Sequence, residues 1–391
     1  MTRTDVDVAV IGGGVVGLAA ALMAARQGLQ VALVEAHEPK AWNAETPDLR
    51  VYALALDNEA LLASFGLWQD IAARRAYPYA EMTVFDEVQA SPLRFHAGEL
   101  GRGHLGHIVE NDLLVDVLWQ AVCREPGIRR HCPERLAALD NGLECVHVRL
   151  AGGAEFSARV AFGADGAASK VRQLLGIGVS EHDYRQKGVV AFLETELPHR
   201  HTAWQRFLST GPLAFLPFGE RRCSIVWSLP EARADEMLAL APEAFCRALD
   251  SAFAGTLGAT RLLSARAAFP LRRRLAEDTL KGRVLLLGDA AHAVHPLAGQ
   301  GVNLGLRDVS SLRDALQSAK AGGDALDLHR LQRWARTRHS ENAVAAYAFE
   351  NINRLFSNDN MALSLLRGHL LGLADRLSPV KNAMARIAAG I

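Results

Sequence analysis

The first 35 residues carry the pattern that most restricts what this chain can fold into. Val6–Ile11 is apolar and predicts a buried strand, and GGGVVG at 12–17 follows it with the spacing G-x-G-x-x-G. The segment 18–27 is rich in alanine and leucine and predicts a helix. Gln30–Val34 predicts a second strand, which is followed directly by Glu35. Elements in this order predict a βαβ unit of the α/β class that binds a dinucleotide.

Each of these residue types has a physical reason to be there. Gly12 permits the tight turn, Gly14 lets a pyrophosphate approach the backbone, and Gly17 lets the helix and the strand pack closely. Glu35 follows the second strand, where a carboxylate accepts hydrogen bonds from a ribose hydroxyl. The unit therefore predicts a site for an ADP-ribose group.

A second glycine-rich segment, GDAAHAVHPLAGQGVNLGLRD, occupies residues 288–308. It follows the apolar run Val284–Leu287, so Asp289 is placed at the carboxyl end of a predicted strand, where open α/β sheets bind ligands. Val302–Asp308 begins a helical pattern. Because a helix N-terminus offers free N–H groups to an anion, this segment predicts a further part of a ligand site.

A third segment, GADGAASKVR at 163–172, follows a predicted strand at Glu155–Gly163. Its Asp165-Gly166 pair is typical of a turn, and local chemistry alone also allows a simple strand-to-helix connection. Alternating residues at 189–196, 213–218 and 223–229 predict antiparallel strands between the glycine-rich segments.

Composition excludes several classes of protein. The 391 residues exceed one typical core and predict two domains. Lys+Arg and Asp+Glu both total 43, and there is no basic tract, so we expect no nucleic-acid partner. Five cysteines without a CxxC pair favour free thiols in a reducing cytoplasm. The apolar run Val8–Ala25 is interpreted as core rather than as a membrane span.

Two pairs of histidines, His104 with His107 and His292 with His295, have the spacing of metal ligands. Neither pair has a carboxylate or cysteine set close to it in the sequence that would complete a metal site. We therefore expect no bound metal.

Together these segments resemble the flavin-dependent aromatic hydroxylases of the p-hydroxybenzoate hydroxylase fold. GGGVVG, GADGAASKVR and GDAAHAVHPLAGQGVNLG stand in the order of that family's three motifs. HLGHIVEN at 104–111, CSIVWSL at 223–229 and LLRGHLLGLADRLSPVK at 365–381 are most similar to the ubiquinone-biosynthesis hydroxylases, in particular to the bacterial 2-polyprenylphenol 6-hydroxylase branch. The resemblance covers nearly the whole chain.

The resemblance implies an α/β fold with a Rossmann-like FAD-binding domain, an inserted antiparallel-sheet substrate domain and C-terminal helices. We expect the FAD-binding domain at 1–75, 100–180 and 272–340, the substrate domain at 76–99 and 181–271, and the helical region at 341–391. In that last region, leucines recur at helical spacing, which suits a helix packed on its own domain, or one that contacts a membrane surface or a partner protein. These leucines are Leu363, Leu366, Leu370, Leu373 and Leu377.

The resemblance also assigns the cofactor residues. Those expected at the ADP half of FAD are Gly12, Gly14, Gly17 and Glu35. Those expected along the phosphates and the ribityl chain are Arg50, Asn111 and Asp289, with Asp165 and Gly166 touching both FAD and NAD(P)H. Those expected against the flavin ring are Pro296, Gly299, Gly301, Val302 and Asn303.

The implied function is an FAD-dependent monooxygenase that hydroxylates a polyprenylated phenol in ubiquinone biosynthesis. NAD(P)H would reduce the non-covalent FAD, O2 would add at flavin C4a, and the distal oxygen of the hydroperoxide would pass to the phenol ring. Because the flavin carries this chemistry, no catalytic side chain is named. The apolar hairpin residues expected to contact the substrate are Leu213, Phe215, Phe218 and Trp227.

Three alternatives remain open from the residues alone: a hydroxylase of a small soluble aromatic, an FAD reductase without hydroxylation, and an FAD-bearing structural subunit. For the main hypothesis we expect a cytoplasmic protein that contacts the inner membrane surface peripherally or binds other ubiquinone-biosynthesis proteins.

Overall fold

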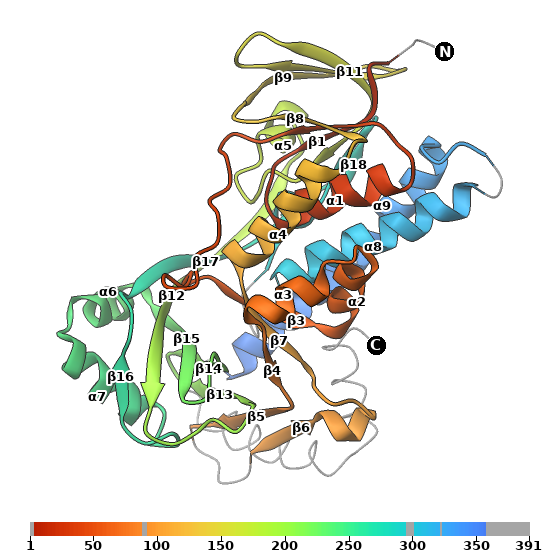
Figure 1. Cartoon of the computed structure of the whole chain (residues 1–391). Coiled ribbons are helices and arrows are strands. Elements are labelled where there is room, and N and C mark those ends of the chain that lie inside the picture. The colour runs from red at the N-terminus through yellow and green to blue at the C-terminus, as the bar shows by residue number, and fades with distance from the viewer. Residues whose placement is uncertain (1–3, 88–91, 295–300, 321–322, 357–391) are drawn as a thin grey trace.

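The computed structural model describes residues 4–87, 92–294, 301–320 and 323–356 (Figure 1). It has an α/β part that carries the N-terminus and, below this part in Figure 1, a large sheet that is antiparallel except for one parallel strand pair. The predicted fold class is confirmed. The domain boundaries given above stay a prediction, and Pro296, Gly299, His295 and the leucines at 363–377 lie outside the described residues.

An eight-stranded sheet forms the centre of the α/β part, with the order β18-β19-β11-β1-β2-β8 and β10 and β9 beyond β11. Parallel pairing of β1 with both β11 and β2 places Val8 opposite Val160 and Val31. The carboxyl ends of these strands consequently meet at one edge of the sheet. The strands are β1 (Val6–Ile11), β2 (Val31–Val34), β8 (Ile128–His131), β9 (Leu136–Asn141), β10 (Val146–Leu150), β11 (Glu155–Gly163), β18 (Leu280–Lys281) and β19 (Val284–Leu286).

Helices cover this sheet, and α1 is the most deeply buried of those described. It packs against α4 and α8, and it begins at Val15, earlier than the sequence pattern indicated. A helix enclosed on all sides needs small apolar residues, which explains its run of alanines. The helices of this part are α1 (Val15–Arg26), α2 (Leu56–Ser64), α3 (Trp68–Arg75), α4 (Asn111–Arg124), α5 (Lys170–Leu174), α8 (Gly301–Lys320) and α9 (Leu328–Phe356), with the 3-10 turn η2 (Gly288–Ala290). The 3-10 turn η1 (Ala97–Leu100) instead follows strand β6 (Leu93–His96) of the second sheet and contacts it.

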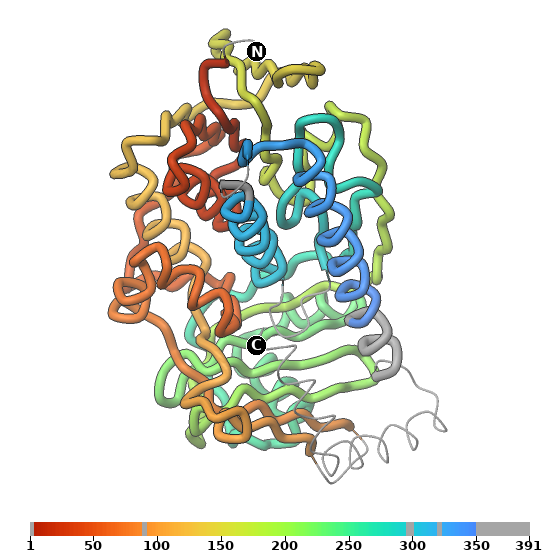
Figure 2. Tube along the Cα trace, turned by 90° about the vertical axis from the view of Figure 1, so that its right-hand side faces the viewer, coloured from red at the N-terminus to blue at the C-terminus, as the bar shows by residue number. Residues whose placement is uncertain are grey.

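The second sheet has nine strands in the order β20-β17-β12-β15-β14-β13-β5-β6, with β16 beside β12. Figure 2 shows its strands running side by side in the lower half of the molecule. The predicted hairpin forms between β14 and β15, where Leu213 pairs with Trp227. The strands are β5 (Glu81–Asp86), β6 (Leu93–His96), β12 (Val179–Thr195), β13 (Thr202–Leu208), β14 (Gly211–Pro217), β15 (Arg222–Pro230), β16 (Thr260–Leu262), β17 (Ala267–Ala276) and β20 (His292–Ala293).

The two faces of this sheet have different neighbours. On the outer face, α6 (Glu231–Ala239) and α7 (Pro242–Ala252) form an apolar core in which Phe215 contacts Phe253, with ring centroids 4.2 Å apart. The opposite face is turned toward the α/β part, and it carries smaller apolar residues such as Ala214.

A small three-stranded sheet has the strand order β3-β7-β4 and lies between the two large sheets in Figure 1. It contains β3 (Val51–Ala55), β4 (Tyr77–Tyr79) and β7 (Gly106–Glu110). Asn303 of α8 is hydrogen-bonded to the backbone of β3. Its side-chain Oδ1 accepts from Ala55 N at 3.0 Å, and its Nδ2 donates to the carbonyl of Ala53 at 2.8 Å. None of the described helices has an apolar stretch long enough to cross a membrane.

Candidate active site

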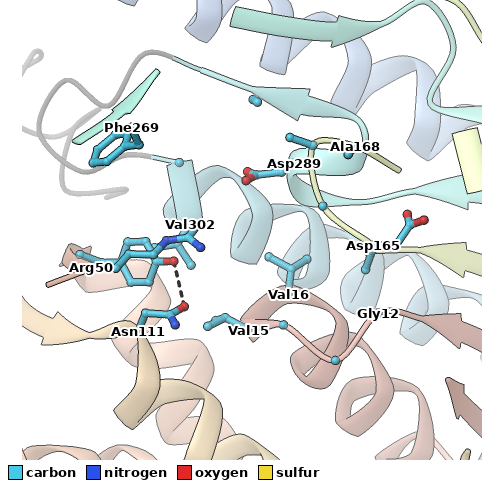
Figure 3. Close-up of a pocket in the computed structure, with 18 of the residues that line it drawn as sticks. Gly12, Val15, Val16, Arg50, Asn111, Asp165, Ala168, Phe269, Asp289 and Val302 are labelled. Atoms are coloured by element: carbon cyan, nitrogen blue, oxygen red, sulfur yellow. Dashed lines mark hydrogen bonds between the residues drawn. The ribbon is translucent and has the colours of Figure 1, made fainter. Parts of the chain in front are cut away.

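A cavity of 1430 Å³ lies between the carboxyl edge of the eight-stranded sheet and the inner face of the nine-stranded sheet (Figure 3). The segments that follow β1, β2 and β11 line one end of it, and β12, β14, β15 and β17 line the other. Of the residues predicted at the cofactor site, those that line the cavity are Gly12, Gly14, Glu35, Arg50, Asn111, Asp165, Gly166, Asp289, Gly301 and Val302.

The three glycines of the first motif differ in their surroundings. Gly12 has φ +113°, and a side chain there would clash with the carbonyl of Ala164. A side chain at Gly17 would clash with the carbonyl of Gly12, which is the close helix–strand contact the sequence predicted. A Cβ at Gly14 would meet nothing within 4 Å, so this glycine leaves the cavity open at the N-terminus of α1.

Glu35 lies immediately after β2, on the floor of the same cavity. Its carboxylate accepts hydrogen bonds from the backbone N–H of Gly13 and, at 2.8 Å, from that of His37. These bonds hold the side chain against the glycine turn. Because an ionised carboxylate has about four acceptor positions, capacity remains for a ligand hydroxyl.

Arg50, Tyr52 and Asn111 also line the cavity, and Figure 3 shows Arg50 and Asn111 on the side away from Gly12 and Asp165. The Tyr52 hydroxyl donates to Oδ1 of Asn111 over 3.1 Å, and burial raises the pKa of Tyr52, so the hydroxyl stays protonated. The Arg50 guanidinium stands over the Tyr52 ring, 5.5 Å from its centroid. Sequence reasoning missed Tyr52, although it stands only two residues after Arg50, near the start of β3.

The loop that carries Arg50 is held by Glu110 at the end of β7. Its buried carboxylate accepts from Trp42 Nε1 at 3.2 Å, from Asp48 N at 2.8 Å and from Arg75 at 3.1 Å. Burial raises the pKa of Glu110 in spite of these donors. Glu110 was not singled out from the sequence, because its three partners are at least 35 residues away along the chain.

Asp289 lies in η2, directly after β19, and points into the cavity (Figure 3). In the part of the chain that the structure describes, no group is hydrogen-bonded or ion-paired to its carboxylate. The N-terminus of α8 at Gly301 and Val302 lines the same cavity. A free carboxylate can accept hydrogen bonds from hydroxyl groups, and the adjacent helix N-terminus can stabilise partial negative charge.

Unlike Asp289, Asp165 is hydrogen-bonded to other groups of the protein. Its Oδ1 accepts from Ser169 Oγ at 2.6 Å and its Oδ2 accepts from the N–H groups of Lys170 and Val171 at 2.7 and 3.0 Å. These bonds satisfy the first turn of α5. The carboxylate thus shapes the edge of the cavity, and Gly166, with φ +80°, turns the chain beside it.

Asn303 and the substrate residues proposed from the sequence do not line the cavity. The Asn303 side chain is directed to β3 and α2. Leu213, Phe215 and Trp227 belong to the outer core with α7, and Phe218 packs against Phe192, with ring centroids 4.4 Å apart and the rings tilted. The residues of β12, β14 and β15 that do line the cavity are Val190, Ala214, Leu216 and Val226.

The physical reason for this correction is that both faces of the sheet are buried. Alternation then gives two apolar sets of residues, and it does not tell which set faces the ligand. The larger aromatic residues fill the space under the helices, while the smaller ones leave room for the cavity.

A buried ionic group holds the segment 288–292, which contains Asp289, against α8. Asp308 of α8 accepts from His292 Nε2 at 2.6 Å, Arg338 Nε at 2.9 Å and Gly288 N at 3.0 Å. Burial alone would raise the pKa of Asp308, but His292, Arg338 and the Gly288 N–H together lower it to about 2. His292 is therefore bound to this carboxylate and is not available as a metal ligand through Nε2.

The cavity fits FAD on the chemistry of its own residues. The open position at Gly14 beside a helix N-terminus suits a pyrophosphate, and Asp289 offers unused acceptors to a polyol chain. The fold and this cavity define an FAD-binding protein in which an α/β part and a second, mostly antiparallel sheet enclose the cofactor site.

Comparison with known proteins identifies the family. Residues 5–346 match the FAD binding domain family. The chain is 35% identical to the 3-demethoxyubiquinol 3-hydroxylase of Escherichia coli (strain K12), with 100% of both chains covered. It is 33% identical to the mitochondrial ubiquinone biosynthesis monooxygenase COQ6 of Homo sapiens, over 99% of this chain and 93% of that one.

The fold is shared with solved structures. The p-nitrophenol 4-monooxygenase PnpA from Pseudomonas putida DLL-E4 superposes with a TM-score of 0.79 at 19% identity, covering 97% of this chain and 96% of that chain. The chain belongs to the FAD binding domain family, among its ubiquinone-biosynthesis hydroxylase members. It is an FAD-dependent monooxygenase that uses NAD(P)H and O2, as the sequence predicted.

Proposed function

We propose that this protein hydroxylates the ring of a polyprenylated phenol in ubiquinone biosynthesis. The relatives described above are, by name, a 3-demethoxyubiquinol 3-hydroxylase and a ubiquinone biosynthesis monooxygenase, and the chain matches the bacterial one over its full length. The observation that carries the proposal is the inner face of the nine-stranded sheet, where the cavity-lining residues of β12, β14 and β15 are Val190, Ala214, Leu216 and Val226. All four are apolar.

This wall suits a phenol with a hydrocarbon tail, because each buried CH₂ contributes about 0.8 kcal/mol. The arginines of β17 that reach the cavity are engaged: Arg272 pairs with Asp183 at 3.0 Å and Arg274 with Glu181 at 2.8 Å. Neither is free to clamp a substrate carboxylate. The wall thus favours a prenylphenol over a benzoate.

The residues have distinct roles in this proposal. The open space at Gly14 and the N–H groups at the N-terminus of α1 bind the FAD pyrophosphate, and Glu35 binds the ribose. Arg50 and Asn111 bind the phosphate and ribityl region of FAD, and Asp289 accepts hydrogen bonds from the ribityl hydroxyls. When bound, the flavin supplies electron transfer from NAD(P)H and activation of O2. The apolar wall positions the phenol ring and excludes water.

We also propose that a membrane surface or a lipid-carrying partner delivers the substrate, since a free polyprenyl tail is insoluble in water. Sedimentation of the purified protein with anionic phospholipid vesicles tests the first route. Protein that pellets with the vesicles, and does not pellet when they are omitted, supports this route. Protein that stays in the supernatant while it turns over carrier-bound prenylphenol points to a protein partner.

A substrate comparison tests the proposed function. The FAD-loaded protein should convert a short-chain prenylphenol to a hydroxylated product and leave 4-hydroxybenzoate and salicylate unchanged. Efficient turnover of the free acids, with none of the prenylphenol, would instead identify a hydroxylase of small soluble aromatics.

A further inference from the structure

A cluster of two histidines and one glutamate lies outside the cavity, where α2 meets β7. Glu59 is on α2, His107 is on β7, and His104 is in the segment that precedes β7. Nδ1 of His107 lies 2.6 Å from Oε1 of Glu59, and Nε2 of His104 lies 3.0 Å from Oε2. One ligand atom from each residue lies within 4.8 Å of the other two.

The Glu59 carboxylate requires a positive partner, since its side chain is only 9% exposed. Within the described ranges, its ion pairs are with the two histidines and with no lysine or arginine. Burying a carboxylate without compensating charge is costly. A cation bound jointly by the carboxylate and the two imidazole rings would supply this compensation.

The two rings are held so that both nitrogens face the same carboxylate. Their centroids lie 4.4 Å apart, with 69° between the ring planes, and the Trp68 ring packs on His107 at 4.9 Å. His107 is 12% exposed and His104 is 34% exposed. The cluster is therefore anchored on its buried side and open to solvent at His104, which gives an ion a way in.

We propose that Glu59, His104 and His107 form a binding site for a divalent transition metal such as Zn²⁺, with water completing the coordination. Two imidazole nitrogens and one carboxylate oxygen suit Zn²⁺ and Co²⁺, whereas Mg²⁺ and Ca²⁺ take oxygen ligands. An ion about 2.0–2.2 Å from each ligand holds neighbouring ligand atoms about 3.3 Å apart. The contacts to Glu59 are now 2.6 and 3.0 Å, and the three ligand atoms lie within 4.8 Å of one another, so the side chains must shift by up to about 1.5 Å to reach this arrangement.

This site is independent of the flavin reaction, and it joins α2 to β7 beside β3. It also reverses the expectation from the sequence, which set the histidine pair aside for want of a carboxylate. Glu59 stands 45 residues from His104 and 48 from His107, so only the fold brings the third ligand to them.

Equilibrium dialysis of the full-length, FAD-loaded protein tests the site after treatment with EDTA. At neutral pH we expect one Zn²⁺ bound per chain, and Co²⁺ in its place should give visible d–d absorption. Glu59→Gln and His107→Gln should each weaken Zn²⁺ binding by more than about 100-fold, beyond the effect of losing an outer partner of a metal ligand. His182→Gln, at an exposed histidine outside the cluster, serves as the control and should bind as the unaltered protein does.

Circular dichroism and the flavin spectrum establish that each variant is folded. If His107→Gln does not fold, the more exposed ligand variant His104→Gln takes its place. The proposal is wrong if the unaltered protein binds no Zn²⁺, or if the cluster variants keep its stoichiometry and affinity. In either case the three residues are a hydrogen-bonded tie between α2 and β7.

Discussion

At the scale of single residues, Gly14 gives the sharpest prediction about FAD. A side chain at this position enters open space in the cavity, so Gly14→Val should fold normally and obstruct the pyrophosphate. We expect FAD affinity to fall by more than about tenfold, about 1.4 kcal/mol. Flavin fluorescence titration measures this, with circular dichroism as the check on folding. A folded variant with unchanged affinity would refute the assignment of this glycine turn to FAD.

Asp289 should act on the cofactor rather than on the fold. Its carboxylate has no protein partner among the described residues, and a hydrogen bond to a charged group contributes about 1.5–3 kcal/mol. Asp289→Ala should therefore weaken FAD binding about 10- to 100-fold and leave the melting temperature of the FAD-free protein unchanged. Asp165→Ala is the contrasting variant, because it removes the acceptor of the first two N–H groups of α5. Like the loss of a capping side chain, this should lower stability by about 0.5–2 kcal/mol. If Asp289→Ala retains FAD but unfolds, its role is structural.

Asp308 should make stability depend on acid. The pKa of its carboxyl is about 2 in the folded chain and 3.8 as a reference for the unfolded one, so its stabilisation is complete above about pH 4 and is lost as pH falls through 2. Asp308→Asn should cost about 3–5 kcal/mol at pH 7, since it leaves His292 and Arg338 without their buried partner.

Urea denaturation between pH 7 and pH 2 measures this effect. The difference in unfolding free energy between the unaltered protein and Asp308→Asn should shrink as pH falls from 4 to 2. Asp314→Asn, at an exposed aspartate of the same helix, is the control and should change little. A constant difference across this range would show that Asp308 ionisation does not contribute.

At the scale of elements, the two faces of β14 should respond to mutation in different ways. Ala214→Phe enlarges a residue that lines the cavity, and the resulting crowding should raise KM for a prenylphenol about 10- to 100-fold while FAD stays bound. Phe215→Ala, one residue along, removes a ring from the core with α7 and should cost about 3–5 kcal/mol of stability. Steady-state kinetics and thermal unfolding separate these outcomes. If Phe215→Ala alters KM at normal stability, the assignment of faces is wrong.

The same strand shows where sequence reasoning succeeds and where it stops. The βαβ unit, the strand before Asp289 and the β14–β15 hairpin were predictable, because glycine spacing, apolar runs and alternation are local properties of the chain. The inward face of β14 was not predictable, because residues 213–218 are apolar on both sides. Likewise, the contacts of Asn303 with β3 and of Glu59 with His104 depend on residues distant in sequence.

At the scale of the whole molecule, two sheets meet at one cavity: the first contributes glycine turns and acidic side chains, and the second contributes an apolar wall. This division separates the binding of a polar cofactor from that of an apolar substrate. Since the two sides come from different elements, substitutions on one side should change FAD affinity and substitutions on the other should change substrate use.

The central claim is that this protein, when loaded with FAD, hydroxylates the ring of a prenylated phenol with oxygen from O2. The most direct measurement is mass spectrometry of the product formed by the FAD-loaded protein under ¹⁸O₂ with NAD(P)H and a short-chain prenylphenol. The account predicts a hydroxylated phenol that carries one ¹⁸O atom on the ring. No labelled organic product should form when the phenol is omitted. Consumption of NAD(P)H with hydrogen peroxide as the only oxygen product, and no labelled phenol, would contradict it.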